Sequence, residues 1–139
     1  MADLEKRTRD FIATQNRDEV ENIVSFFAPG GARIQPGNVK RGHAELREFY
    51  SMVSKALGTR HSTIDKLFVF GNTVAIEYTE TAQHMVDTKT PWGTIPASKQ
   101  DFTIHGAAFL LFNGDKIEEL RPYSDAWLQM IARSQLVKS

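Results

Sequence analysis

A carboxylate and an imidazole share the apolar face of one predicted strand. Side chains alternate between the two faces of a strand, so every second residue of segment 73–86 points the same way. One of these faces carries, in order, Val74, Ile76, Tyr78, Glu80, Ala82 and His84. The apolar members predict that this face is buried, and a lone buried carboxylate is costly unless it is paired, hydrogen-bonded or neutral. We therefore expect a polar site inside an apolar cavity, with Glu80 as its general acid or base.

Glu80 and His84 each allow a second interpretation. Glu80 would have a purely structural role if a cation such as Arg33, Lys66 or Arg121 held it. His84 lies roughly 13 Å along the strand from Glu80, at ~3.3 Å per residue, so the two side chains do not touch directly. His84 is then either a second catalytic group that acts through a bound substrate or a histidine at the solvent-exposed rim.

Two more candidate catalytic residues, His61 and Tyr50, lie outside this strand. His61 begins the neighbouring predicted strand, where it either meets Glu80 or His84 or lies on the surface. Tyr50 belongs to the apolar stripe of a predicted helix, a pattern more typical of a core residue than of a catalytic one. A buried phenol nevertheless needs a hydrogen-bond partner, which a cavity would supply.

Three further residues have structural explanations. His105 follows the phase opposite to Ala108, so it faces away from the cavity unless Gly106 forms a β-bulge that redirects it. Asp125 is explained as the N-cap of a last helix. Trp92 lies in a predicted loop, either as an aromatic lid over the cavity or as a contact between two copies of the chain.

Hydrophobic periodicity predicts the helices that must position these residues. Helical spacing favours helices at 3–15, 18–27 and 43–57, and a short one that begins at Asp125. Asp18 and Glu21 resemble a capping box at the start of the second helix. The run Pro29-Gly30-Gly31 predicts a break, followed by a short extended stretch at 32–35.

Period-two spacing predicts the strands, which all follow the third helix. We expect them at 61–70, 73–86, 100–112 and 116–124, with a longer loop at 87–98 that covers a cavity mouth. Helices followed by a strand meander are typical of an α+β domain. The sequence therefore predicts one domain over residues 1–139, in which a curved antiparallel sheet wraps around helices.

The composition argues against several classes of function. The chain has 139 residues, with 17 basic and 17 acidic side chains and no cysteine. The balanced charge argues against a nucleic-acid or anionic-membrane partner, and the lack of cysteine excludes disulfides and thiol chemistry. The N-terminal segment is too charged for a signal peptide and no apolar run could span a bilayer, so we expect a cytoplasmic protein. Four dispersed histidines make a weak case for a metal, and we expect no cofactor.

The order of elements, with GHAELREFY on the third helix and FNGDKIEELRPYSD closing the sheet, resembles the nuclear transport factor 2-like superfamily. Within it, the chain is similar to SnoaL-like, ketosteroid-isomerase-like and scytalone-dehydratase-like proteins. The resemblance implies a cone-shaped α+β barrel with a deep apolar pocket and no metal or organic cofactor. It also implies a homodimer formed through the outer face of the sheet.

The match to ketosteroid isomerase is partial. Tyr50 lies at the position of an active-site tyrosine of that enzyme. The resemblance implies that its catalytic base falls near Gln35, its oxyanion tyrosine near Phe11 and its oxyanion acid near Ala108. All three chemical groups are missing from this chain, so we do not expect steroid isomerisation.

The other two matches are also incomplete. His61 and His84 correspond to the two active-site histidines of scytalone dehydratase, and LRPYSDAW resembles its closing strand. The tyrosines that hold its catalytic water correspond to Gln15 and Pro36, so that part is lost. Epoxide hydrolases of this fold use a strand arginine and aspartate; Glu80 keeps the carboxylate, and the arginine is absent.

Together these residues predict a cofactor-independent isomerase, cyclase or dehydratase that acts on a small apolar oxygenated molecule, such as a polyketide or terpenoid. Glu80 with His84 or His61 would exchange a proton, and Tyr50 would donate a hydrogen bond to the developing oxyanion. The residues expected to shape the substrate pocket are Phe11, Gln35, Tyr78, Trp92, Ala108, Leu110, Leu120 and Trp127. The alternative is a module of the same fold that binds a small molecule or dimerises without turnover.

Overall fold

The computed structural model describes residues 2–138, with side chains described as far as Arg133. These residues form four helices and eight strands. In chain order they are α1 (Leu4–Asn16), α2 (Val20–Ser25), β1 (Phe27–Gln35), β2 (Asn38–Arg41), α3 (His43–Ala56), β3 (His61–Phe70), β4 (Thr73–Gln83), β5 (Thr88–Thr90), β6 (Gly93–Ile95), β7 (Asp101–Asn113), β8 (Lys116–Ser124) and α4 (Ala126–Lys138). No helix of the described chain is long and apolar enough to cross a membrane.

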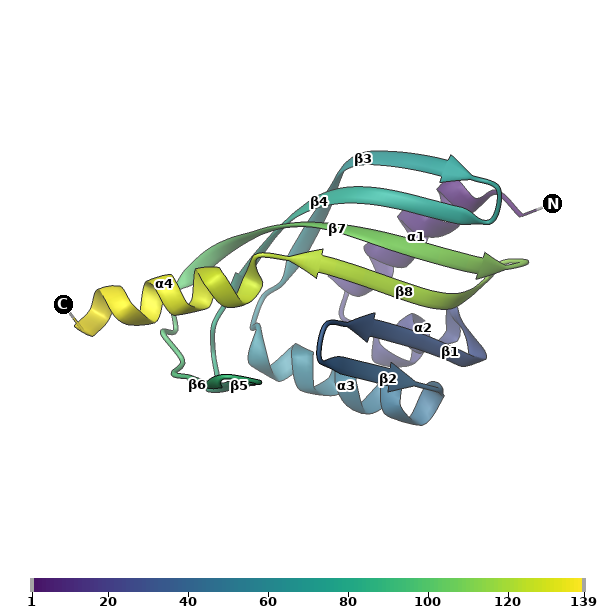
Figure 1. Ribbon diagram of the computed structural model, residues 1–139. Coiled ribbons are helices and arrows are strands. Elements are labelled where there is room, and N and C mark those ends of the chain that lie inside the picture. Colours follow the sequence, from purple (N-terminus) through teal and green to yellow (C-terminus); the bar gives the residue numbers. More distant parts are fainter. Residues whose placement is uncertain (1, 139) are drawn as a thin grey trace.

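Six strands form one curved sheet in the order β2-β1-β8-β7-β4-β3. Only β1 and β8 pair in parallel, and the other neighbours are antiparallel. Figure 1 shows the long strands bending together over α1, α2 and α3, while α4 and the β5–β6 hairpin lie at one end. The predicted α+β class, with helices packed in a curved antiparallel sheet, is confirmed.

The inner face of the sheet, which we define as the face toward α1–α3, carries the main core. Alternate residues of β4 and β7 pack there against an aromatic cluster from the helices and β1, where the Phe11 ring meets Phe26 and Phe27 edge-on. Burying these side chains supplies most of the driving force for folding. The fully buried members include Phe11, Ile23, Phe27, Leu46, Val74, Leu110, Phe112 and Ile117.

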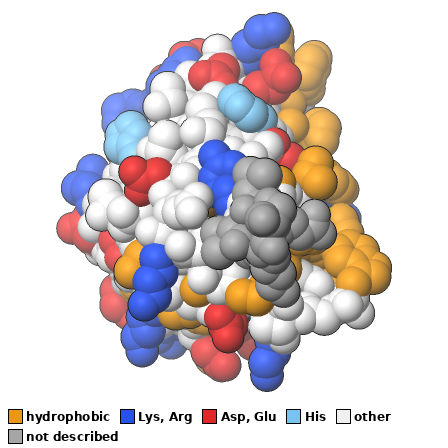
Figure 2. All heavy atoms as spheres, turned by 90° about the vertical axis from the view of Figure 1, so that its left-hand side faces the viewer, with side chains coloured by type: hydrophobic (Ala, Val, Ile, Leu, Met, Phe, Trp, Pro, Cys, Tyr) orange, Lys and Arg blue, Asp and Glu red, His pale blue; other side chains and the backbone are white. Residues whose placement is uncertain are grey.

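The outer face of the same strands is exposed and partly apolar. Phe68, Phe70, Phe109 and Tyr123, which we call the outer-face patch, are each about half exposed or more. The rings of Phe109 and Tyr123 meet edge-on at 6.3 Å between centroids. In Figure 2 hydrophobic side chains gather along the right-hand edge, which corresponds to the front of Figure 1, where the outer face lies.

One predicted feature of the N-terminal half is wrong. The capping box does not form, because α2 begins at Val20 after a Glu19 cap that makes no side-chain hydrogen bond. Asp18 instead has a positive φ of 58° and accepts a hydrogen bond from Ser54.

The second helix ends before the run at 29–31, as predicted, but the run itself lies within β1, as a bulge between Phe27 and Ala32 in the pairing with β8. Gly31 is required there, since an added Cβ would lie 2.6 Å from the Ile117 carbonyl oxygen.

Two short elements were missed. The extended stretch at 32–35 pairs with β2, and the predicted loop at 87–98 contains the β5–β6 hairpin. Each of the missed strands has only three or four residues. Segments this short carry too little alternation to be recognised as strands.

Candidate active site

A cavity of about 220 Å³ lies between the inner face of the sheet and α1, α3 and α4. Apolar side chains make most of its wall. Seven of the eight residues predicted to shape the pocket line it: Phe11, Gln35, Tyr78, Ala108, Leu110, Leu120 and Trp127. That they bind substrate stays a prediction.

Glu80 lies on the inner face and lines this cavity with a side chain that is 12% exposed. Its Oε1 accepts a 2.6 Å hydrogen bond from the Ser62 hydroxyl, directly across from it on β3. The same oxygen lies 4.0 Å from a guanidinium nitrogen of Arg60. The carboxylate is therefore enclosed, with a hydroxyl donor and a guanidinium beside it.

The cation beside Glu80 is not one of the three that the sequence suggested. Lys66 pairs with Glu77, and Arg121 pairs with Glu119. Arg60 was missed, although it lies two residues before Ser62, and side chains two apart in extended chain share a face. The position of Arg60 beside Glu80 follows only if Ser62 faces inward, which the pattern of this strand does not indicate.

The end of α1 fixes Ser62 in place. The Asn16 side chain donates to the Ser62 carbonyl at 2.9 Å and accepts from the Ser62 amide at 2.7 Å. This pair of bonds joins the last residue of α1 to the start of β3, an edge strand whose backbone groups would otherwise lack partners. Asn16 thus positions the hydroxyl that holds Glu80.

Arg33 from β1 brings a second guanidinium to the cavity. Its guanidinium carbon lies 4.3 Å above the centre of the Phe49 ring, and it donates a hydrogen bond to the side-chain carbonyl of Gln35. Burial lowers the pKa of Arg33, and the charge of Arg60 acts in the same direction. Sequence reasoning named Arg33 only as a structural partner of Glu80, but the structure pairs it with neutral groups.

Tyr78 points into the cavity across β7. Its ring lies over Gly106, where an added Cβ would approach the Tyr78 hydroxyl and ring to 2.6 Å. Burial raises the pKa of the Tyr78 phenol, and the nearby charge of Glu80 raises it further. The β4–β7 register is regular through Gly106, so the glycine makes room for this ring and forms no bulge. His105 accordingly stays exposed on the outer face.

Tyr50 is not among the residues that line the cavity. Only 1% of it is exposed, and its ring packs edge-on against Phe49 and near Phe27, at 5.3 and 6.4 Å between centroids. Its hydroxyl has no hydrogen-bond partner of good geometry among the described residues. Burial raises the pKa of this phenol, with Arg33 and Arg60 opposing the shift. The expectation that Tyr50 donates a hydrogen bond to a substrate oxyanion is therefore wrong, because Phe49 and Arg33 occupy the cavity wall here.

His61 does not face the cavity, contrary to expectation. Its side chain is exposed, whereas that of Ser62 is buried. The cause is a bulge in β3: Ile64 pairs with Tyr78 and Lys66 with Glu77, which leaves Asp65 as an extra residue. An extra residue reverses the alternation, so counting back by twos from the apolar end of the strand places His61 on the wrong face.

His84 is fully buried but does not line the cavity either. It follows the end of β4, its ring packs against Phe102, and its Nε2 lies 2.9 Å from the Thr88 hydroxyl. Burial lowers the pKa of His84. The imidazole thus anchors the β5–β6 hairpin, whose Thr88 does line the cavity. The expectation that His84 exchanges a proton with a substrate in the cavity is wrong, because its side chain does not reach the cavity wall.

The aromatic residues at the end of the cavity form a pair. The Trp92 ring meets that of Trp127 edge-on at 5.4 Å between centroids. Trp92 is 78% exposed and lines an adjoining recess of about 270 Å³ with Gln35 and Pro36, outside the main cavity. Asp125 precedes α4, but its carboxylate binds the His105 amide and the Gln129 side chain.

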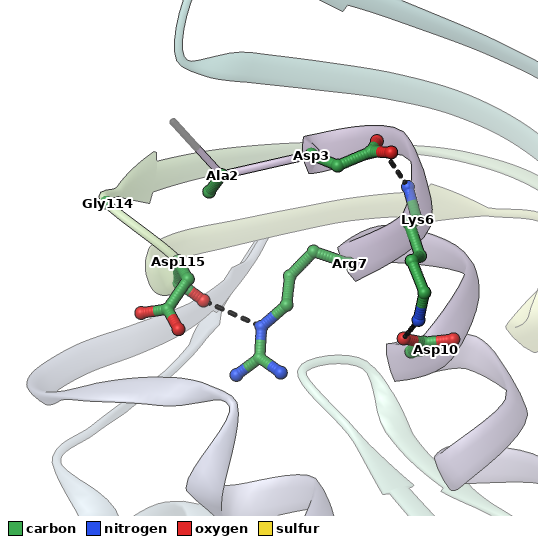
Figure 3. Close-up of a pocket in the computed structure, with 7 residues that line it drawn as sticks. All are labelled: Ala2, Asp3, Lys6, Arg7, Asp10, Gly114 and Asp115. Carbon is green, nitrogen blue, oxygen red and sulfur yellow. Dashed lines mark hydrogen bonds and ion pairs between the residues drawn. The ribbon is translucent and has the colours of Figure 1, made fainter.

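A second, more open recess of about 550 Å³ lies between the start of α1 and the β7–β8 turn. Figure 3 shows that its polar groups are bonded to one another: Lys6 to Asp10 and, through its backbone, Asp3, and Arg7 to the carbonyl of Asp115. These groups already have partners, so this recess is not a candidate site. Within the described chain, no cluster of three or more His, Asp or Glu side chains could hold a metal ion.

Comparison with known families gives a match to the SnoaL-like domain over residues 8–120. The chain belongs to the SnoaL-like family, within the nuclear transport factor 2-like superfamily. No curated protein sequence matches it.

Many solved structures share the fold. A putative SnoaL-like polyketide cyclase from Jannaschia sp. CCS1 is 13% identical, with 96% of each chain covered and a TM-score of 0.77. TsrD from Streptomyces laurentii is 18% identical, with 94% of this chain and 93% of TsrD covered and a TM-score of 0.78. TerC, co-crystallised with polyporic acid, is 18% identical, with 96% and 97% covered and a TM-score of 0.70. At these identities the likeness shows the fold alone.

Proposed function

We propose that this SnoaL-like protein is a cofactor-independent acid–base catalyst, an isomerase, cyclase or dehydratase, for a small apolar oxygenated molecule. One observation carries the proposal: Glu80 is a nearly buried carboxylate on the wall of an otherwise largely apolar cavity. Enclosed carboxylates with close charge partners in a cleft are frequent general bases. The family match and neighbours named as polyketide cyclases agree with this class of chemistry.

In the proposed reaction, Glu80 removes a proton from a carbon next to a carbonyl group. The electron pair of the broken C–H bond moves toward the oxygen, where negative charge develops. The Arg33 guanidinium and the Tyr78 hydroxyl line the same cavity and are available to stabilise that charge. In isomerisation the proton returns to another carbon. In cyclisation the carbanion forms a bond to a second carbonyl carbon, and the oxygen of that carbonyl takes the proton. In dehydration the enolate expels a hydroxyl from the adjacent carbon, which takes the proton and leaves as water.

The exchange of carbon-bound protons for deuterium tests this proposal without the natural substrate. The protein would be incubated in D₂O with 2-tetralone, an enolisable bicyclic ketone, and the loss of α-proton signal followed by NMR. We expect wild type to accelerate the exchange and Glu80→Gln to lose that acceleration. Equal exchange with wild type and Glu80→Gln would refute the role of Glu80.

A second candidate function is a binding module without turnover. The observation that favours it is that Ser62 and Arg60 already hold Glu80, as they would hold a structural carboxylate. Saturable binding of 2-tetralone with no exchange above the buffer rate would support this candidate over the first.

We also propose that the protein forms a homodimer through the outer face of the sheet. The outer-face patch offers aromatic side chains that are exposed in a single chain, and large exposed apolar patches commonly mark protein interfaces. Sedimentation of wild type and Phe109→Glu should give a dimer and a monomer, respectively. A monomeric wild type at micromolar concentration would contradict this proposal.

A further inference from the structure

The charged groups that line the cavity do not balance. Arg33, Arg60 and Lys89 contribute three cations, whereas Glu80 is the single anion among the described residues of the wall. Arg60 lies within 4.0 Å of Glu80. Lys89 is exposed on β5, so water screens its charge. The cation that remains both enclosed and unmatched is Arg33.

The surroundings of Arg33 contain no compensating charge. Its neighbours include the Phe49 ring, the Gln35 amide and the phenols of Tyr50 and Tyr78, all of which are neutral. The charge beside it is that of Arg60, which has the same sign. None of the ion pairs among the described residues includes Arg33. A cation out of water without a counter-ion is costly, and proteins normally pair it. The Arg33 site is therefore electrostatically incomplete without an anion.

We infer that the cavity binds a small organic monoanion, whose planar carboxylate or acidic enolate group pairs with Arg33 while its ring lies against the apolar wall. A guanidinium binds a carboxylate through two parallel hydrogen bonds, and it can donate to the single charged oxygen of an enolate. This inference names the substrate class and rests on the proposed function only in placing the ligand in the same cavity.

The cavity volume limits the size of this anion. At about 220 Å³, it exceeds the ~150 Å³ of an engineered cavity that binds benzene. It lies below the ~300 Å³ at which pockets for drug-sized ligands begin. A molecule with one or two rings fits these bounds.

Paired probes that differ in charge but hardly in shape test the inference. Titration calorimetry at pH 7.5 would compare 2-naphthoate with 2-naphthamide, and the acidic enol 4-hydroxycoumarin with coumarin. We expect the anion of at least one pair to bind about 10- to 100-fold more tightly, as for hydrogen bonds to charged groups. The pair that discriminates identifies the anion as a carboxylate or an enolate.

Arginine variants locate the effect. Arg33→Met keeps an apolar side chain of similar reach and should abolish the preference for the anion. Arg121→Met is the matched control, because Arg121 lies on β8 beside Glu119, outside the cavity, and it should keep the preference. Thermal melting would show that both variants fold, and the wild-type comparison needs no variant at all.

The outcomes separate this inference from the proposed function. Failure of wild type to prefer the anion in either pair would overturn the inference, even if Glu80-dependent deuterium exchange is intact. An anion preference that Arg33→Met retains would overturn it as well. A preference that depends on Arg33, in a protein that shows no deuterium exchange, would uphold the anion site and refute catalysis of this kind.

Discussion

Each face of the sheet departs locally from the usual distribution of side chains. The inner face encloses a carboxylate between a hydroxyl and a guanidinium, whereas the outer face exposes four aromatic rings. Both faces are formed by alternate residues of the same strands, so two neighbouring residues of one strand lie in the two different environments. A buried charged side chain and an exposed apolar patch are both unusual in a monomeric protein, and a ligand and a partner, respectively, would explain them. Matched substitutions on the two faces test this contrast.

The largest contrast concerns two glutamates on β4. Glu80 lines the cavity, whereas Glu77 is 61% exposed and faces Lys66 on the outer side. We expect Glu80→Gln to slow deuterium exchange by about 100- to 10,000-fold, the range for a lost general base. Glu77→Gln should leave the rate unchanged. Equal losses in both variants, measured by NMR, would erase the functional difference between the faces.

The next contrast concerns stability, at two adjacent residues of β7. Leu110 is fully buried on the inner face, and Phe109 is about half exposed on the outer face. Leu110→Ala should lower the free energy of unfolding by about 2–5 kcal/mol, because it leaves a cavity in the core. Phe109→Ala should lower it by less than about 1 kcal/mol. Urea denaturation of wild type and both variants, at a protein concentration low enough for sedimentation to show monomers, gives these values, and a larger loss at Phe109 would contradict the assignment of faces.

A smaller effect is expected where the backbone makes room for Tyr78. Gly106→Ala adds a methyl group that would overlap the Tyr78 ring and approach the Tyr123 carbonyl oxygen to 2.8 Å. We expect a loss of about 1–3 kcal/mol, the usual consequence of overpacking, and weaker ligand binding as the ring moves. Gly30→Ala is the control, since nothing lies within 4 Å of its added Cβ. Urea denaturation that shows similar stability for both variants would mean that Tyr78 is free to move.

The sequence was sufficient to assign Glu80 to the inner face, because β4 is long and keeps strict alternation. It was not sufficient for β3, where the extra residue Asp65 reverses the alternation between Leu67 and Ser62. That reversal hid Ser62 and Arg60, whereas His61 had become a candidate through its match to a histidine of scytalone dehydratase. A bulge is set by pairing with the neighbouring strand, which a local pattern does not encode.

The fold could be predicted more completely than the site. Long helices and strands have periodic signals of ten or more residues, and the motif resemblance covers the whole chain. The contact of Arg33 with Phe49 joins β1 to α3. It forms because α3 packs on β1, a strand of which only residues 32–35 were predicted as extended. Long-range contacts of this kind determine the charge of the cavity, so sequence reasoning missed the functional importance of Arg33.

The smallest effect is the pH dependence that the buried histidine confers on stability. His84 is fully buried, whereas His61 is exposed on the outer face. Burial lowers the pKa of His84 in the folded protein. The unfolded chain therefore binds a proton more readily, and stability present above the unfolded pKa of ~6.5 is lost as the pH falls toward the folded value. Urea midpoints at pH 7.5 and 5.5 should differ less for His84→Gln than for wild type. His61→Gln should keep the wild-type difference, and an unchanged difference in His84→Gln would show that the buried imidazole is not its source.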